Sequence, residues 1–205
     1  MNNSRNKMIY KIWSPIYDYF FNRGSFYKAR KKIFSEIPYQ AGEKILFVGV
    51  GTGADLEFFD SSMVDITAID YSPDMLSRAK ARFQDSHIEF HEMDAQELEF
   101  ANEQFDYVIA SLILSVVPDA EKCFQEAARV MKKDGQMIIF DKFSPKGEKL
   151  SFLKRTFRPI VALFGTDIGI SFEKLFEKHR THITIKEDGP ILFNGMYRKI
   201  VLEKK

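Results

Sequence analysis

The sequence predicts an α/β protein with a doubly wound, seven-stranded sheet in which one strand runs antiparallel to the others. Three observations lead to this fold class. An unbroken apolar run, Ile45–Val48, is typical of a parallel strand that is buried on both faces. Glycines at positions 49, 51 and 53 then place a tight turn after that strand, and Asp70 closes the next one. Near the C-terminus, two strand-like segments flank the turn-forming run Asp188–Pro190, which predicts an antiparallel hairpin.

The expected elements follow in order along the chain. Two helices, Lys7–Asn22 and Ser25–Ile37, precede the first strand. After the second strand, Ser72 suits a helix N-cap and Pro73 suits the first helical position. Later helices are expected at Ala120–Met131 and Phe172–Arg180. The strands are expected at Lys44–Val48, Ile66–Asp70, Ile88–His91, Phe105–Ala110 and Gln136–Asp141, followed by the hairpin strands Thr181–Glu187 and Met196–Glu203.

The glycine-rich stretch ILFVGVGTGADLEFF (45–59), followed by AIDYSPDML (68–76), is typical of a nucleotide-binding half-site. It reads as a strand, a glycine turn, a helix and a second strand that ends in an acid. Without Cβ atoms, the loop can turn sharply and point its amides at a ligand. Asp70 follows Gly49 by 21 positions, close to the spacing at which an acid accepts the two hydroxyls of an adenosine ribose.

Two ligands suit such a half-site. With Ala54 in the last position, the loop satisfies G-x-G-x-x-A, so a nicotinamide dinucleotide and an oxidoreductase function stay open. Three features favour S-adenosylmethionine instead. The loop begins some 45 residues into the chain, and no segment is long enough for a separate dehydrogenase catalytic domain. The Tyr-x-x-x-Lys motif at Tyr27 and Lys31 lies upstream of the loop, whereas a short-chain dehydrogenase carries it far downstream.

Further segments resemble the class I S-adenosylmethionine-dependent methyltransferases, of the methyltransferase type 11 group, over most of the chain. MDAQELEF (93–100) resembles the segment after the third strand, FDYVIASLILSVVPD (105–119) the fourth strand and the loop that faces the methyl group, and EAARVMKKDGQMIIFD (126–141) the helix, turn and fifth strand. The resemblance implies a Rossmann-like sheet with a helical N-terminal cap and a helical insert after the fifth strand. It also implies S-adenosyl-L-methionine as cofactor.

The resemblance further assigns residues to sites. It implies that Asp94 binds the adenine amino group, and Ser111 and Ser115 lie where substrate should meet cofactor. The expected cofactor-binding residues are Gly49, Gly51, Thr52, Gly53, Asp70, Tyr71, Met75, Met93, Asp94, Ala95 and Ser111. Tyr17 and Ser111 are the catalytic candidates; Tyr17 can donate a hydrogen bond or face the sulfonium, and it also suits a core or rim position. No convincing catalytic base is present.

One position departs from the family pattern. Phe47 stands two residues before the first glycine, where the family usually has Asp or Glu. That acid helps to hold the methionine part of the cofactor. The ammonium group must therefore find other partners, such as backbone carbonyls near Gly49 and Ser111 or bound water. A non-enzymatic interaction module with a degenerate site is a further alternative.

Composition indicates one domain in the cytoplasm. The 205 residues are 45% hydrophobic, close to the usual one-domain size, without an eighteen-residue apolar run or an N-terminal secretion signal. Cys123 is the only cysteine and suits an inert core thiol. The four histidines match no metal-binding pattern, so no metal is expected. Without an Asn-Pro-Pro-Tyr or Asp-Pro-Pro-Tyr element after the fourth strand, a nucleic-acid substrate is disfavoured. Nothing in the sequence indicates the oligomeric state.

Charge is strongly segregated along the chain. Residues 45–141 carry seven Lys and Arg against nineteen Asp and Glu, whereas residues 1–44 carry nine against three and residues 142–182 nine against four. We expect a helical cap (1–43), a cofactor-binding core (44–141), a basic helical insert (142–182) and a terminal hairpin (183–205). The basic segments are also rich in aromatic residues, which suits peripheral contact with an anionic membrane, although solvated helix faces and core packing explain the same pattern.

The lead-in WSPIYDYFFNRG (13–24), the loop VGVGTG (48–53), the segment SLILSVVPD (111–119) and the downstream RPIVALFG (158–165) narrow the resemblance. Together they are similar to bacterial phosphatidylethanolamine N-methyltransferases and, more distantly, to quinone C-methyltransferases and membrane-associated thiol methyltransferases. This implies a small or amphiphilic acceptor, with a phospholipid amine among the candidates. The acceptor itself is not identified.

Overall fold

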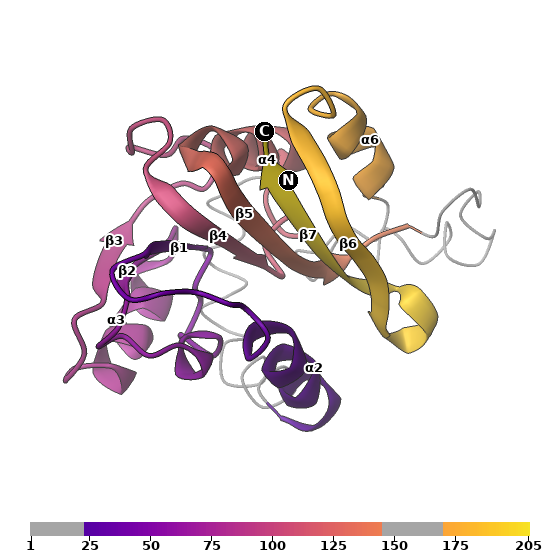
Figure 1. Cartoon of the computed structure of the whole chain (residues 1–205). Coiled ribbons are helices and arrows are strands. Elements are labelled where there is room, and N and C mark those ends of the chain that lie inside the picture. The colour runs from indigo at the N-terminus through magenta and orange to yellow at the C-terminus, as the bar shows by residue number, and fades with distance from the viewer. Residues whose placement is uncertain (1–22, 145–169) are drawn as a thin grey trace.

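The computed structural model describes residues 23–144 and 170–205, and seven strands of these ranges form one sheet in the order β3-β2-β1-β4-β5-β7-β6 (Figure 1). The predicted helix at Lys7–Asn22, the residue Tyr17 and most of the predicted basic insert lie outside the described residues. The strands are β1 (Lys44–Val48), β2 (Asp65–Asp70), β3 (Glu89–Glu92), β4 (Phe105–Ser111), β5 (Met131–Lys142), β6 (Ile183–Leu192) and β7 (Tyr197–Lys204).

The pairing of the strands confirms the predicted mixed sheet. Strands β1 to β5 pair with one another in parallel, and β7 runs antiparallel to both β5 and β6. The all-parallel dinucleotide-binding order, 3-2-1-4-5-6, has no such reversed strand next to the fifth. The topology therefore already separates this chain from the dinucleotide alternative.

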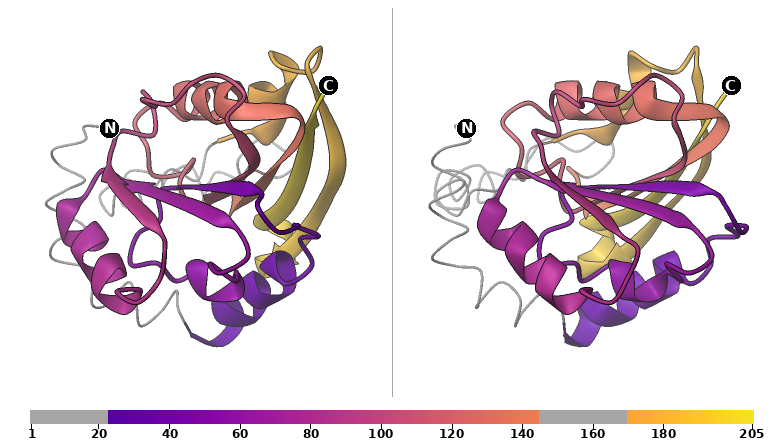
Figure 2. Two further views of the ribbon diagram at one scale, coloured as in Figure 1. Left: turned by 60° about the vertical axis from the view of Figure 1, so that its left-hand side comes forward. Right: turned by 90° about the vertical axis from the view of Figure 1, so that its left-hand side faces the viewer.

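Helices cover both faces of the sheet, as the turned views show (Figure 2). One face carries α2 (Gly24–Phe34), the 3₁₀ turn η1 (Leu56–Phe58) and α3 (Pro73–Arg82), and the other carries α4 (Ala120–Val130) and α6 (Phe172–Glu177). Two apolar cores result because alternate residues of each strand point to opposite faces. In β1, Ile45 and Phe47 join the α2 core, whereas Leu46 and Val48 join the α4 core.

The cap of α3 forms as the sequence predicts. The Ser72 hydroxyl accepts a hydrogen bond from the Met75 amide at 3.4 Å, and Pro73 occupies the first helical position. This cap directs the chain away from the sheet directly after Asp70. Most predicted strand ends agree with the structure within one residue, but α2 and α6 each end three residues earlier than expected.

Two predicted elements were wrong. The hairpin turn is not at Asp188–Pro190: β6 continues through these residues, and the chain turns at η2 (Phe193–Gly195). Pro190 is tolerated because β6 is an edge strand that pairs only with β7. No strand lies on its other side, so the missing N–H of Pro190 removes no hydrogen bond there. In addition, the segment after the glycine loop forms only the short η1, not a full helix.

The predicted turn at Lys132–Gly135 lies inside the element β5. Register runs from Phe105 opposite Met131 directly to Tyr107 opposite Gln136, so the turn residues bulge out of the ladder. Asp134 has a positive φ of 60°, and the Lys132 ammonium lies 2.8 Å from the Asp106 carboxylate. The start of β5 is therefore pinned to the start of β4 by a bulge and an ion pair.

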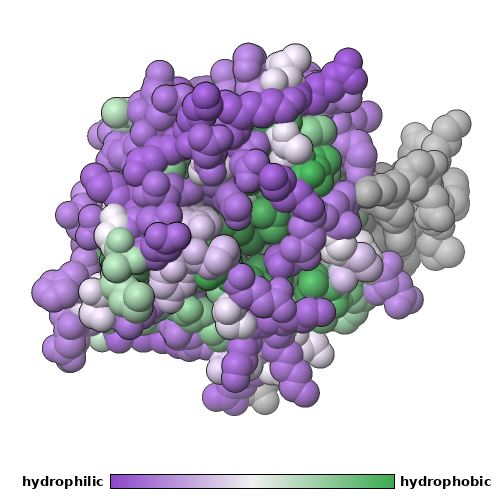
Figure 3. Space-filling view, in the orientation of Figure 1, coloured by the Kyte–Doolittle hydropathy of each residue, from purple (hydrophilic) through white to green (hydrophobic). Residues whose placement is uncertain are grey.

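The surface in the orientation of Figure 1 is mainly hydrophilic at its rim, with hydrophobic residues gathered toward the middle of the face (Figure 3). Within residues 23–144 and 170–205, no helix is long and apolar enough to cross a bilayer.

Candidate functional site

The residues that the sequence singles out gather at the carboxyl ends of the parallel strands. The glycine loop follows β1, Asp70 ends β2, the segment 93–96 follows β3 and Ser111 ends β4. Because β3, β2, β1 and β4 are adjacent and parallel, these four points meet along one edge of the sheet. Ligands of open α/β sheets bind at this edge.

The three loop glycines have different surroundings. A Cβ at Gly49 would clash with the Ile113 side chain, because the loop after β4 packs directly on this glycine. A Cβ at Gly53 would lie 3.0 Å from the Phe83 ring. At Gly51, with φ of 57°, a Cβ would meet no atom of the described residues within 4 Å. Packing therefore excludes a Cβ at position 49 and crowds one at position 53, whereas Gly51 faces open space within the described part of the chain.

Asp70 joins the glycine loop to the cap of α3. Its Oδ2 accepts from the Gly51 amide at 2.8 Å, and its Oδ1 accepts from the Ser72 amide at 2.8 Å. Burial raises the pKa of the Asp70 carboxyl, although these amide hydrogen bonds oppose the shift. The side chain thus holds the loop in place and keeps further lone pairs for a ligand.

The segment after β3 continues this edge. The Met93 amide donates to the Asp70 carbonyl at 3.1 Å, and the Met93 sulfur accepts from the Glu99 amide. Asp94 accepts from the backbone and side chain of Gln96, and Ala95 is buried beside it. Among the other predicted cofactor residues, Met75 is buried in α3, Tyr71 is partly exposed after β2 and Thr52 is half-buried in the loop.

The end of β4 leads into a sharply bent loop. Leu112 has a positive φ of 56°, and its amide donates to the Phe140 carbonyl at 2.7 Å. The Ser111 hydroxyl is buried and has no hydrogen-bond partner among the described residues. A buried hydroxyl without a partner is unusual and is a natural contact for a ligand.

Comparison with known proteins decides the class. The model of the family "Methyltransferase domain" matches residues 46–139. A phosphatidylethanolamine N-methyltransferase from Cereibacter sphaeroides is 30% identical over 96% of both chains. The chain belongs to the S-adenosylmethionine-dependent methyltransferases. A demethylmenaquinone methyltransferase from Listeria monocytogenes is 30% identical over 97% of this chain and 86% of its own. The crystal structure of YcgJ from Bacillus shares the fold, with a TM-score of 0.70 and 16% identity over 87% of this chain and 98% of its own.

The methyltransferase family and the topology set aside the nicotinamide alternative and identify S-adenosyl-L-methionine as the methyl donor. The residues present fit this group. Gly51 faces open space, Asp70 and Asp94 offer carboxylate oxygens, and the Ser111 hydroxyl is a buried polar atom in need of a partner. Each feature lies at the edge where the four parallel strands end.

The Phe47 side chain does not point toward the sheet edge where the cofactor is expected, as the Asp or Glu usual at this position would. Its ring is buried in the α2 core and meets the Phe59 ring edge to face at 4.9 Å. Phe59 in turn stacks on Tyr39 and lies 5.8 Å from Phe34. The departure from the methyltransferase pattern therefore serves apolar packing beneath the glycine loop, and the side chain at this position has no group that could bind the cofactor's ammonium.

Sequence reasoning missed three polar contacts around the methyltransferase site. Asp141, fully buried at the end of β5, accepts from the Ser115 amide at 3.1 Å and so holds the loop after β4. Burial raises the pKa of the Asp141 carboxyl. Arg30 of α2 and Asp55, two residues after the glycine loop, form a largely buried ion pair at 2.9 Å. Gln96 links Asp94 to Asp119. The partners are 25 or 26 residues apart in the first two contacts, and no local motif marks any of the three.

The remaining predictions on this site concern Tyr17 and metals. Tyr17, the cap candidate for catalysis, lies outside the described residues. The described part of the chain contains no group of three or more His, Cys, Asp and Glu side chains that could hold a metal ion. Cys123 is buried in α4, where burial raises the pKa of its thiol.

Proposed function

We propose that this methyltransferase transfers methyl groups to the amine of a phospholipid headgroup. The observation that carries the proposal is the similarity to a phosphatidylethanolamine N-methyltransferase over 96% of both chains. That similarity includes the segments outside the cofactor-binding core, which are the parts that differ among methyltransferases of different acceptors.

The cofactor contacts follow from the chemistry of the side chains. When bound, S-adenosyl-L-methionine supplies a methyl group on a sulfonium sulfur, which a nucleophile takes in line with the carbon–sulfur bond. We assign the two ribose hydroxyls to Asp70 and the adenine amino group to Asp94, because carboxylate oxygens accept hydrogen bonds and these two groups lie at or just beyond the ends of the neighbouring strands β2 and β3. The open space at Gly51 allows close approach of the cofactor to the loop.

The acceptor side is formed by the loop after β4. Ser111 is the catalytic candidate among the described residues. Its hydroxyl would orient the acceptor by a hydrogen bond and would not act as a base toward it. A neutral amine needs little beyond positioning and exclusion of water, so the reaction does not require a dedicated base. The Asp141–Ser115 contact keeps this loop in one conformation.

A lipid acceptor also implies contact with a membrane surface. The helix α2 exposes Lys28, Lys31 and Lys32, and the Arg30–Asp55 pair holds α2 beside the glycine loop. Each lysine near an anionic surface contributes about 1 kcal/mol at low salt. Salt-sensitive sedimentation with phosphatidylglycerol vesicles, and weaker sedimentation with phosphatidylcholine vesicles, is the expected result.

A quinone ring carbon is the second candidate acceptor, because a demethylmenaquinone methyltransferase matches 97% of this chain at the same identity. Carbon methylation needs a ring that is activated toward the methyl group, whereas a neutral amine is already a nucleophile. Both acceptors are amphiphilic, so one experiment should compare them.

The test is transfer of radiolabelled methyl groups from S-adenosylmethionine in mixed vesicles. One set contains phosphatidylethanolamine, a second demethylmenaquinone and a third only phosphatidylcholine. Label in methylated phosphatidylethanolamine, lost in Asp70→Ala, supports the proposal. Label in the quinone alone would replace it with the second candidate. Label in neither lipid, with transfer to the water-soluble fraction of a cell extract assayed in parallel, would overturn a lipid acceptor.

A further inference from the structure

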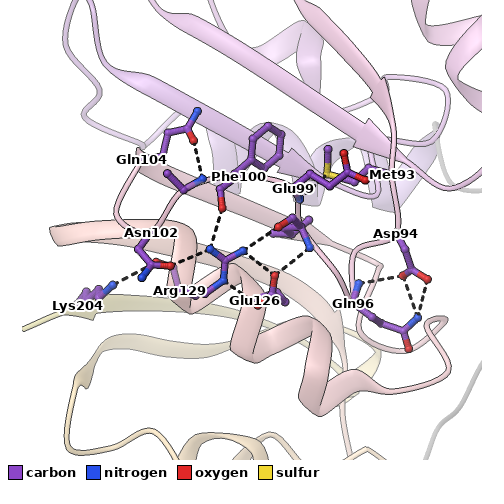
Figure 4. Close-up of polar contacts among 12 residues, drawn as sticks. Met93, Asp94, Gln96, Glu99, Phe100, Asn102, Gln104, Glu126, Arg129 and Lys204 are labelled. Carbon is purple, nitrogen blue, oxygen red and sulfur yellow. Dashed lines mark hydrogen bonds and ion pairs between the residues drawn. The ribbon is translucent and has the colours of Figure 1, made fainter.

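The side chain of Gln96 contacts the Asp94 carboxylate (Figure 4) and also reaches Asp119, the N-cap residue of α4. Its Nε2 is 2.9 Å from Asp94 Oδ1 and 3.2 Å from Oδ2, and its Oε1 accepts from the Asp119 amide at 2.9 Å. The Gln96 backbone amide also donates to Asp94 Oδ1 at 2.9 Å. Three donor contacts from one residue thus converge on a single carboxylate.

The polarity of these contacts leaves one orientation for the Gln96 amide. The Asp119 backbone N–H can only donate, so the atom that faces it must be the oxygen. The NH₂ group must then face Asp94, whose carboxylate oxygens accept. Asp119 is itself held, because its side chain caps α4 by accepting from the Lys122 amide at 3.0 Å. The orientation of Asp94 is thereby tied to a helix end.

This orientation matters for the base of the nucleoside. The exocyclic amine of adenine is a donor, which complements a carboxylate that only accepts. A 6-oxo purine presents an acceptor oxygen at the same position, and a fixed carboxylate cannot turn away from it. A site that hydrogen-bonds a substrate N–H rejects an analogue without that donor, because the polar atoms of the site are then left unpaired.

A second set of contacts holds the same loop without touching Asp94. The Arg129 guanidinium donates to the carbonyls of Leu98 and Phe100 at 2.8 Å, and to Asn102 and Glu126, as Figure 4 shows. Glu126 in turn accepts from the Leu98 amide at 2.9 Å. Arg129 therefore stabilises the loop as a whole. Of these two residues, Gln96 is the one that contacts the Asp94 carboxylate.

We propose that Gln96 is a positioning residue that orients Asp94 and so determines the preference of this methyltransferase for adenine over 6-oxopurine in the cofactor. The inference rests on the proposed assignment of the adenine amino group to Asp94. It makes Gln96 a specificity determinant that acts through a neighbour. Arg129 differs, because its contacts reach the loop backbone, Asn102 and its own helix and do not include Asp94.

The test measures two dissociation constants by calorimetry, for S-adenosylhomocysteine and for its 6-oxo analogue S-inosylhomocysteine. Gln96→Glu keeps the side-chain length and an oxygen for the Asp119 amide, but it turns the donor toward Asp94 into an acceptor of like charge. Gln96→Met removes both contacts and is the second variant if Gln96→Glu does not fold. Arg129→Met is the matched loop variant, and thermal unfolding confirms that each protein is folded.

We expect wild type to prefer S-adenosylhomocysteine, and the ratio of the two constants to fall about ten-fold in the Gln96 variants. In Arg129→Met we expect a lower melting temperature and weaker binding of both compounds at an unchanged ratio. An unchanged ratio in both Gln96 variants, with wild type still selective, would overturn this inference alone. A folded wild-type protein that binds neither compound would overturn the cofactor assignment, and the inference with it.

Discussion

Replacing Gly51 by alanine tests whether the open space at the glycine loop is the cofactor site. The φ of Gly51 is 57°, and a Cβ there would meet no atom of residues 23–144 and 170–205 within 4 Å. Gly42, at the turn before β1, provides a matched control, because its φ is 81° and a Cβ there would also meet nothing. The two substitutions thus impose the same kind of backbone strain at two places, and only position 51 faces the proposed site.

The expected loss of stability is the same for both variants. An alanine in the left-handed region costs about 1–2 kcal/mol. Alanine also lowers the conformational entropy of the unfolded chain, which offsets about 0.4–1 kcal/mol of that loss. The net loss is about 1 kcal/mol, which for a chain of this size corresponds to a melting temperature lower by about 2–4 °C.

The two variants should differ in cofactor binding. At position 51 the new methyl group projects into the space that we assign to S-adenosylmethionine, so we expect at least a ten-fold loss of affinity for S-adenosylhomocysteine, about 1.4 kcal/mol. Gly42→Ala should bind as wild type does. Thermal unfolding and calorimetry on the three proteins measure both quantities. Wild-type affinity in a folded Gly51→Ala protein would refute the assignment of this space to the cofactor.

Four further predictions concern the polar and buried groups. Asp70→Ala should weaken S-adenosylhomocysteine by about 1–3 kcal/mol in calorimetry, since ribose hydroxyls lose their acceptor. Burial raises the pKa of the Asp70 carboxyl. As the pH is lowered, the affinity of wild type for S-adenosylhomocysteine should therefore begin to fall at a higher pH than an ordinary aspartate would give. An affinity that stays constant down to the ordinary aspartate range would contradict this. Arg198→Met removes a buried guanidinium from Asp188 and Glu173 and should lower the free energy of unfolding in urea by about 3 kcal/mol. Lys186→Met breaks the exposed pair with Glu203 and should lower it by less than about 1 kcal/mol. Equal losses in the two variants would argue against the burial effect. Cys123 should not react with Ellman's reagent in the native protein at pH 8, because burial raises the pKa of its thiol, whereas rapid native labelling would show an accessible thiolate.

Local sequence was sufficient for the core of the fold. The run Ile45–Val48 lies in β1, Asp70 ends β2, and Ser72 and Pro73 start α3 as predicted. These features depend on neighbours within a few residues: an apolar run for a doubly buried strand, a hydroxyl cap and a ring that presets φ. The cofactor class and the family also followed from short motifs in a fixed order, and comparison with known proteins confirmed both.

The C-terminal hairpin and the contacts around the site depended on tertiary structure. Whether Pro190 ends a strand depends on whether that strand is an edge, and this is a property of the whole sheet. A helix was expected after the glycine loop, but only the short η1 forms there. Phe59, which directly follows η1, packs on Phe47, Phe34 and Tyr39.

The polar contacts show the same limit of local sequence. Arg30 reaches Asp55, Ser115 reaches Asp141 and Gln96 reaches Asp119 across 23 to 26 residues. Residue type reveals that these side chains need partners, because a buried polar group without one is costly. Only the arrangement of the strands and helices around one sheet edge decides which partner each receives.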